Sequence, residues 1–418
     1  MQIKDELLVG LRNLERFLGN LPAPVSAELL RRIAELRQLL VEQRPPRLLL
    51  VGRRGAGKST LLNAIFGEAV AAVGHTGRGT LEPRWYEYRS ERGALDVLDT
   101  RGMGESPKPG EPSPRKATIA AIGEACREKA PDAVLFLVKA KEVDSRAEED
   151  VDDLAAVCSK IQESQGSRLA IIGIVNQCDE LSPPTVRLER PDATPRYQEK
   201  LRAVQVVEQK LAERIRARPE LASELVTSLG VVSYAEWDSG GAVVEDLRWR
   251  VEELVRYLFE ELPAQAQVEL ARISRVRKLQ RELAMRIVQA TAGVCATVAA
   301  VPIPIADIGP ITAAQVGMVT AIGYIGGREL SAKAAGEFLV ALGVNVGAGF
   351  LFRELARGLI RWAFPGGGSL VSAGIAYAAT VGLGAAAVAY FVEGKSVREA
   401  QEVYGSERER GEREYRRE

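Results

Sequence analysis

Val51-Gly52-Arg53-Arg54-Gly55-Ala56-Gly57-Lys58-Ser59-Thr60 is the stretch that decides the fold of this 418-residue chain. It follows the apolar run 48–51 and precedes the helix-like run 61–66, which together predict a strand, a glycine-rich turn and a helix start. Such a turn points successive backbone N–H groups at phosphate oxygens, and the helix N-terminus adds a partial positive charge. We expect Lys58 to reach the β- and γ-phosphates of a nucleotide and the Ser59 hydroxyl to hold Mg²⁺.

A second motif places an acid and a glycine at the end of a strand. Asp99-Thr100-Arg101-Gly102 follows the strand-like run 94–98. An acid in that position can hold Mg²⁺ through water, and a flexible glycine can give its N–H to the γ-phosphate. Asp99 is therefore the expected metal residue and Gly102 the expected phosphate contact.

Two later motifs indicate which base is bound. Asn176-Gln177-Cys178-Asp179 follows the buried-type run 169–175, and Ser233-Tyr234-Ala235 follows the short run 230–232. The Asp179 carboxylate could accept two hydrogen bonds from the N1–H and the exocyclic amine of guanine, donors that adenine does not present there. Four motifs in this order, each after an apolar run, predict a guanine nucleotide at the ligand-binding edge of an open parallel sheet.

This order of motifs resembles the Era-like branch of the P-loop GTPases, over about residues 45–262. The run from Lys58 to Gly67 is close to that family's pattern, and so is the ending from Gly240 to Leu258. The resemblance implies an α/β domain with a mostly parallel sheet flanked by helices, GTP or GDP with Mg²⁺ as ligands, and GTP hydrolysis. It also implies a switch I threonine within residues 75–80, where Thr80 fits the distance from Lys58 better than Thr76.

The predicted site residues come from these motifs. The metal residues are Ser59, Thr80 and Asp99, and the catalytic residues are Lys58, Thr80, Gly102 and Arg54. The nucleotide-binding residues are Gly52, Arg53, Arg54, Gly55, Ala56, Gly57, Lys58, Ser59, Thr60, Thr80, Asp99, Gly102, Asn176, Gln177, Asp179, Ser233 and Tyr234.

Three positions depart from the family pattern. Gln177 replaces the usual lysine along the base, which predicts modest affinity. Met103 stands where many GTPases carry a water-orienting glutamine, so intrinsic hydrolysis should be slow. Gly55 stands where the potassium-activated members carry asparagine, so no potassium site is expected.

Two arginines in the turn are open to two interpretations. A guanidinium from Arg53 or Arg54 near the γ-phosphate could neutralise charge in the transition state, in cis or across a dimer. Alternatively, both are solvated loop residues.

Composition fits an intracellular protein. Lys+Arg and Asp+Glu both number 56, so the net charge is zero and nucleic acid is not an expected partner. The 4 cysteines have no metal-site spacing and suit a reducing compartment. No cleavable-signal pattern opens the sequence, which favours a cytoplasmic location.

Outside the nucleotide domain the chain predicts a second, all-α domain. Residues 1–44 carry two leucine-rich helical periodicities separated by Leu21-Pro22-Ala23-Pro24, which predicts a helical hairpin. Residues 45–262 form the nucleotide domain, 263–400 a hydrophobic helical domain, and 401–418 a charged tail that is a solvated helix or disordered. The hairpin and the hydrophobic helices together would build the all-α domain.

The hydrophobic domain raises the question of a membrane. After a basic amphipathic helix at 264–286, uncharged runs cover 287–306, 308–327, 338–352 and 362–392, and Ser369 to Val392 is the best candidate to span a bilayer. These runs are rich in Ala and Gly, so their insertion energy per residue is small, and a soluble helical domain with a buried core fits them as well. The segment around Asp307 is similar to a hydrophobic domain often fused to bacterial Era-like GTPases.

Helices before the nucleotide domain and a larger hydrophobic helical domain after it also resemble immunity-related and dynamin-like GTPases. That resemblance implies a nucleotide-dependent homodimer or oligomer that drives hydrolysis and remodels an anionic membrane. The protein would then be peripheral to, or inserted in, the inner face of the membrane. The alternative is a cytosolic molecular switch whose helical domain binds a protein partner.

Overall fold

The computed structural model describes residues 12, 30–31, 33–34, 37–39, 41–71, 83–99, 114–165, 168–300, 309–328, 338, 342 and 369–415. They divide into two compact units. The α/β unit comprises Pro45–Pro263 with Ile273–Arg275. The described residues of Met1–Arg44, Ala264–Arg272 and Val276–Glu418 form the helical unit.

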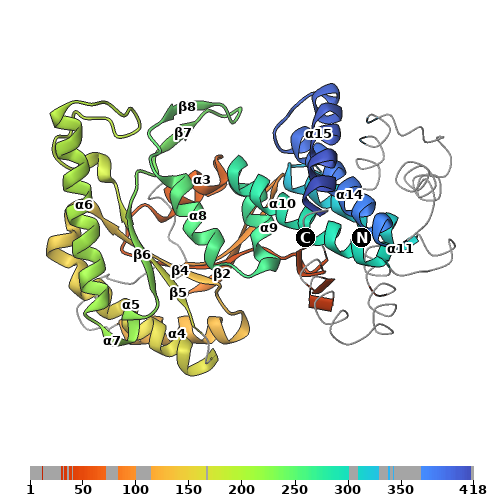
Figure 1. The fold of residues 1–418 in the computed structure, drawn as a ribbon. Helices are drawn as coiled ribbons and strands as arrows, with labels where there is room; N and C mark the ends of the chain where they lie inside the picture. Colours follow the sequence, from red (N-terminus) through yellow and green to blue (C-terminus); the bar gives the residue numbers. More distant parts are fainter. Residues whose placement is uncertain are drawn as a thin grey trace. The chain divides into compact units, whose positions relative to one another are not determined.

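The α/β unit is built on a six-stranded sheet of order β2-β3-β1-β4-β5-β6 (Figure 1). The strands are β1 Arg47–Val51, β2 Arg84–Ser90, β3 Gly93–Asp99, β4 Ala133–Lys139, β5 Ala170–Asn176 and β6 Leu225–Gly230. Only the β2–β3 pair in this sheet is antiparallel, and the other neighbours pair in parallel. The mostly parallel sheet expected from the sequence is confirmed.

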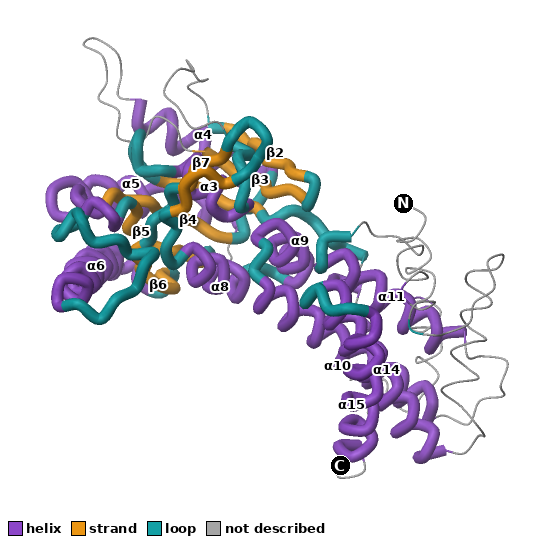
Figure 2. Tube along the Cα trace, turned by 90° about the horizontal axis from the view of Figure 1, so that it is seen from above, coloured by secondary structure: helices purple, strands orange, loops and turns teal. Residues whose placement is uncertain are grey.

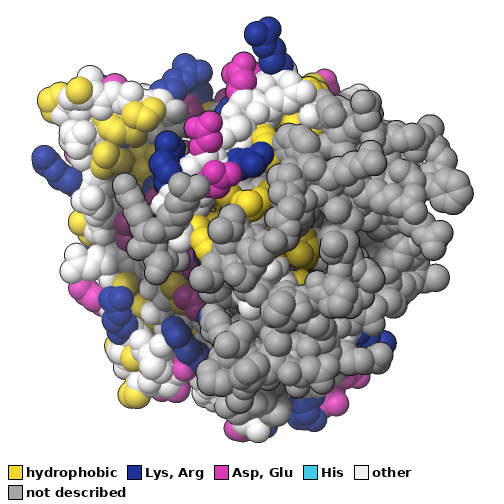
Figure 3. Space-filling model, turned by 45° about the vertical axis from the view of Figure 1, so that its right-hand side comes forward, with side chains coloured by type: hydrophobic (Ala, Val, Ile, Leu, Met, Phe, Trp, Pro, Cys, Tyr) yellow, Lys and Arg dark blue, Asp and Glu magenta, His cyan; other side chains and the backbone are white. Residues whose placement is uncertain are grey.

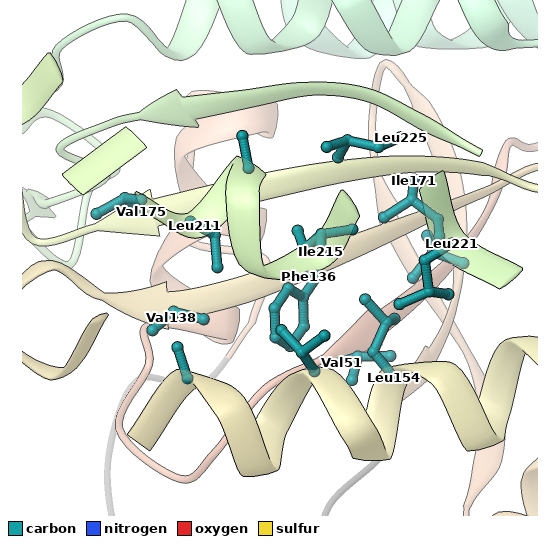
Figure 4. Packing of buried hydrophobic residues seen from close by; sticks show 14 of the residues in the cluster. Val51, Phe136, Val138, Leu154, Ile171, Val175, Leu211, Ile215, Leu221 and Leu225 are labelled. Carbon is teal, nitrogen blue, oxygen red and sulfur yellow. The ribbon is translucent and has the colours of Figure 1, made fainter. Parts of the chain in front are cut away.

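Helices cover both faces of the sheet. They are α3 Lys58–Phe66, α4 Pro114–Glu128, α5 Val143–Gln165, α6 Pro195–Arg216, α7 Pro219–Ala222 and α8 Val251–Glu261. On one face, Val51, Phe136 and Val175 pack against Leu154 of α5 and Leu211 of α6 (Figure 4). Successive strand residues point to opposite faces, so the buried residues between them face the side where α3 packs on α8.

The last strand of the sheet begins earlier than the sequence indicates. The sequence indicates a strand by the short run 230–232, whereas β6 is Leu225–Gly230. β6 lies at the sheet edge and its middle residues are only half-buried, so Thr227 and Ser228 interrupt the apolar run that would have marked it. A two-stranded hairpin of β7 Ala235–Trp237 and β8 Val243–Asp246 follows, which the sequence analysis did not predict.

The helical unit contains α9 Ala264–Ser274, α10 Arg277–Ala300, α11 Gly309–Ile325, α14 Ser369–Phe391 and α15 Val397–Tyr415. Helices α10, α14 and α15 run alongside one another, with α14 packed against both α10 and α15 (Figure 2). The single basic helix predicted over 264–286 is wrong, because α9 and α10 are separated at Arg275, whose φ is 57°. No glycine or proline marks that break, so apolar periodicity alone could not locate it.

Helix α15 gives the charged end of the chain a defined structure. Its outward face is dense in Glu and Arg, while Ala400, Tyr404 and Gly411 are buried. The segment expected to be a solvated helix or a disordered tail is thus, up to Tyr415, a helix with one buried face on α14. The composition of the tail did not indicate this buried face, because alanine, tyrosine and glycine make the contact with α14 and no leucine stripe is present.

Among the described residues one helix is long and apolar enough to cross a membrane by length and composition. It is Ala373–Phe391 of α14, and 61% of the apolar window is buried within the structure. The core helix of a soluble protein passes the same test.

Candidate functional site

The phosphate-binding turn lies between β1 and α3, as the sequence predicts. Gly57 caps α3 with a φ of 91°, a conformation that side chains other than glycine rarely adopt. A Cβ at Gly57 would also overlap the Asn176 side-chain amide. The turn is therefore glycine-dependent for two independent reasons, and it brings the N-terminal turn of α3, which carries Lys58, Ser59 and Thr60, to the carboxyl edge of the sheet.

Lys58 supplies positive charge to the turn. Its ammonium donates to the carbonyl oxygens of Gly52 at 2.6 Å and Arg53 at 3.3 Å. The side chain therefore folds back over the loop that would surround the phosphates.

Oxygen ligands suited to Mg²⁺ lie next to the turn. Asp99 is the last residue of β3, is buried, and stands in register beside Leu50 of β1. Ser59 lies in the first turn of α3. A carboxylate at the end of β3 and a hydroxyl in the first turn of α3 are the hard oxygen donors that Mg²⁺ prefers, so these two residues fit the ion.

Asn176 joins three of the predicted motifs. It ends β5 with 1% of its surface exposed. Its amide donates to the Ala56 carbonyl at 2.9 Å, and its side-chain oxygen accepts a hydrogen bond from the Ser233 hydroxyl at 3.0 Å. One buried side chain thus ties the phosphate turn to the loops that follow β5 and β6.

Gln177 and Asp179 flank the expected position of the base. Gln177 has a left-handed backbone with a φ of 63°, and its amide donates to the Gly55 carbonyl at 3.1 Å. The glutamine therefore lies along the phosphate turn, where the family's lysine is expected. Asp179 is half-buried, and burial raises the pKa of its carboxyl above the usual value.

The two arginines of the turn have different surroundings. The Arg53 guanidinium is paired with Asp150 at 2.5 Å and Glu149 at 2.7 Å, both on α5. Two carboxylates hold the Arg53 charge and only 18% of its side chain is exposed, so the interpretation of Arg53 as a solvated loop residue is wrong. Arg54 is exposed on the turn.

The remaining predicted residues are distributed as follows. Ser233 is buried, whereas Tyr234 is exposed and its hydroxyl donates to Glu236 at 3.2 Å. Thr80 and Gly102 lie outside the described residues, as do Thr76, Met103 and Asp307.

Two lysines near the site were missed by the sequence analysis. Lys139 ends β4, and its ammonium would be 3.3 Å from a Cβ at Gly55. Its position after a buried strand run is the same signal that identified Asp99 and Asn176, so it could have been found. Lys200 lies in α6 beneath the Asp179 loop, and nothing in the sequence separates it from a solvated helix lysine.

The fold and the arrangement of these motifs define the α/β unit as a P-loop GTPase domain of the Era-like kind. The family described as 50S ribosome-binding GTPase matches residues 47–177. Uncharacterized protein YkfA of Escherichia coli (strain K12) is 32% identical over 133 residues, which are 31% of this chain and 42% of YkfA. The tRNA modification GTPase MnmE of Chlorobium chlorochromatii (strain CaD3) is 28% identical over 166 residues, 38% of this chain and 33% of MnmE. The chain therefore spans less than half the length of these relatives.

Solved structures are similar at a lower level. Toc33 from Arabidopsis thaliana in complex with GDP and Mg²⁺ is 16% identical, covering 58% of this chain and 94% of Toc33, with a TM-score of 0.35. A member of an oligomerised bacterial dynamin pair is 15% identical, covering 68% of this chain and 55% of that protein, also with a TM-score of 0.35.

Proposed function

We propose that this protein binds GTP and GDP with Mg²⁺, hydrolyses GTP, and couples its nucleotide state and dimerisation to membrane association through the helical unit. The proposal of nucleotide binding rests on the two hydrogen bonds of the Asn176 side chain, to the Ala56 carbonyl and from the Ser233 hydroxyl. They connect the phosphate turn to the loops that carry Asp179 and Ser233. Lys58 and the α3 N-terminus supply positive charge for phosphates, and Ser59 and Asp99 supply oxygens for Mg²⁺.

The first experiment tests nucleotide choice and turnover. Calorimetry with Mg²⁺ should show binding of GTP and GDP and no comparable binding of ATP. Lys58→Ala should abolish phosphate release, whereas Lys160→Ala, which removes a surface lysine paired with Glu163, should not. Equal affinity for ATP and GTP would overturn the guanine assignment.

Dimerisation is proposed because the pattern lacks a water-orienting glutamine at Met103. A group from a second copy, such as the exposed Arg54, could neutralise transition-state charge in its place. Turnover per molecule should then rise with protein concentration in the micromolar range. A specific activity that stays constant, and that Arg54→Ala leaves unchanged, would count against this step.

Membrane association is supported by two features of the helical unit. Helix α14 is long and apolar enough to span or enter a bilayer. Of the basic residues that the helical unit carries between 264 and 286, four are exposed, namely Arg277, Lys278, Arg281 and Arg286, and would attract anionic headgroups by on the order of 1 kcal/mol each near the surface. Arg272 is the exception, because it is buried and stacks on the Tyr324 ring at 4.0 Å. On the face in Figure 3, basic and acidic side chains of described residues are interspersed.

The alternative is a cytosolic switch whose helical unit binds a protein partner. The observation that favours it is the burial of α14 between α10 and α15, with polar contacts inside the packing. Gln315 of α11 donates to the Thr380 hydroxyl of α14 at 2.8 Å, and Thr380 is 0% exposed. A specific internal hydrogen bond between helices suits a bundle that stays folded in water.

A further inference from the structure

A lysine with no exposed surface lies beneath the loop that carries Asp179. Lys200 belongs to the first turns of α6, and its exposed fraction is 0%. Its ammonium donates to the backbone carbonyls of Asp179 at 2.7 Å, Pro183 at 3.1 Å and Val186 at 2.9 Å. An ammonium has three N–H donors and no acceptor, so one loop takes up its whole hydrogen-bonding capacity.

Burying this cation has a cost that the loop must offset. Desolvation lowers the pKa of Lys200, and the nearby Asp179 carboxylate opposes that shift. An apolar side chain of similar length would fill the same space without desolvating a charge. It would, however, leave three loop carbonyls without these donors, so the lysine serves the conformation of the loop rather than the packing of α6.

A second side chain on the same face of α6 holds the next part of the loop. Tyr197, three residues before Lys200, is buried, and its hydroxyl donates to the Leu188 carbonyl at 3.1 Å. The helix start itself is fixed, because the Thr194 side chain accepts a hydrogen bond from the Tyr197 N–H at 3.2 Å. The loop from Asp179 to Leu188 is therefore tied at four carbonyls to the first two turns of one capped helix.

We infer that Lys200 is a positioning residue for base recognition: it fixes the loop 179–186 so that the Asp179 carboxylate is held at the place where guanine presents its N1–H and exocyclic amine. Lys200 has no surface with which to touch a nucleotide, so it acts through the backbone of Asp179. The inference rests on the proposed function, since it takes Asp179 as the residue that reads the base.

The test compares GTP with inosine triphosphate, which keeps the N1–H but lacks the exocyclic amine. Dissociation constants for both are measured by calorimetry on the full-length protein and on Lys200→Met. A displaced Asp179 weakens two hydrogen bonds to GTP but one to inosine triphosphate. We expect GTP affinity to fall roughly 10- to 100-fold, the range for one hydrogen bond to a charged group, and the preference for GTP over inosine triphosphate to fall with it.

Lys210→Met is the matched control. Lys210 lies on the same helix, but its side chain is 42% exposed and pairs with Asp144 at 2.8 Å on the surface. It removes the same charge from α6 without touching the loop, so both affinities should match wild type. A folded Lys200→Met protein that keeps its preference for GTP, or that loses the two affinities by the same factor, would overturn the inference and leave Lys200 with a structural role alone.

A milder variant decides the matter if Lys200→Met does not fold. Tyr197→Phe removes one hydroxyl from the same set of loop contacts and keeps the ring in place. It should lower the preference for GTP in the same direction by a smaller factor, and an unchanged preference would overturn the inference. If instead the wild-type protein does not prefer GTP over ATP, the proposed function itself is wrong, which is a different result from a wild-type preference that the variants retain.

Discussion

At the scale of single residues, Asp179 is predicted to read the base, because a carboxylate accepts two hydrogen bonds where guanine offers two donors. Asp179→Asn should weaken GTP binding by about 3 kcal/mol, the upper range for a hydrogen bond to a charged group. An amide N–H₂ can donate to the carbonyl that xanthine carries in place of the amine, so the variant should gain affinity for xanthosine triphosphate.

Calorimetry with both nucleotides checks this prediction. Gain of xanthosine triphosphate binding also serves as the control for folding, since a disordered loop would bind neither. An Asp179→Asn protein with wild-type GTP affinity would show that another residue reads the base.

A second prediction concerns Gly57, where backbone conformation and close packing act together. Gly57→Ala requires a side chain at a φ of 91° and places its Cβ against the Asn176 amide that holds the turn. We expect nucleotide binding to be lost and the α/β unit to lose about 2 kcal/mol or more, the sum of backbone strain and a broken buried hydrogen bond.

Gly241→Ala is the control that separates the two effects. Gly241 has a nearly equal φ of 81°, but nothing lies within 4 Å of a Cβ there. It should show the strain alone, with nucleotide binding intact. Fluorescent-nucleotide titration and thermal unfolding measure both variants, and equal effects at the two glycines would contradict the role assigned to the Asn176 contact.

At the scale of elements, α14 and α15 pack through glycines. A Cβ at Gly382 of α14 would lie 2.9 Å from the Tyr404 carbonyl of α15, whereas a Cβ at Gly405 of α15 meets nothing within 4 Å. Gly382→Ala should therefore destabilise the helical unit by about 1–3 kcal/mol through overpacking. Gly405→Ala should stabilise it by about 1 kcal/mol, because alanine favours helix over glycine.

Gly382→Ala and Gly405→Ala make the same glycine-to-alanine change on two facing helices, so each variant is the control for the other. Urea unfolding followed by circular dichroism measures the change in the free energy of unfolding for each variant. If both substitutions stabilise the protein to the same extent, the contact between α14 and α15 does not form in solution.

The elements also show what a sequence can and cannot predict here. Strands β1, β3 and β5 were located within a residue or two, because each is buried on both faces and appears in the sequence as an apolar run that ends in a motif. The start of β6, the hairpin β7–β8 and the break at Arg275 were missed. Thr227 and Ser228 interrupt the apolar run of β6, β8 is exposed along its length, and no glycine or proline marks the left-handed backbone at Arg275. Lys200 was missed for a related reason: its role depends on which carbonyls a loop brings to it, and that is set only by the fold.

For the whole molecule, we predict that GTP binding makes the helical unit release α14 to a bilayer. The apolar surface of the uncharged helices must be shielded from water, and α15 shields part of it by packing its buried face on α14. If nucleotide binding loosens that packing, α14 becomes available to lipid. Full-length protein should then float with anionic vesicles in a GTP analogue, and less so with GDP or without nucleotide.

A disulfide lock makes the last prediction decisive. A Cβ at Gly411 would lie 3.4 Å from the Ala378 Cβ, close to the spacing of a disulfide, so Ala378→Cys with Gly411→Cys should join α14 to α15. The 4 native cysteines are all buried, which favours the engineered pair during oxidation. The oxidised variant should bind GTP normally but fail to float, and reduction should restore flotation, because only the release of α15 is blocked. Equal flotation of the oxidised and reduced forms would mean that α14 is not the membrane element. Protein that ignores vesicles in every nucleotide state, locked or not, would favour the cytosolic switch with a protein partner.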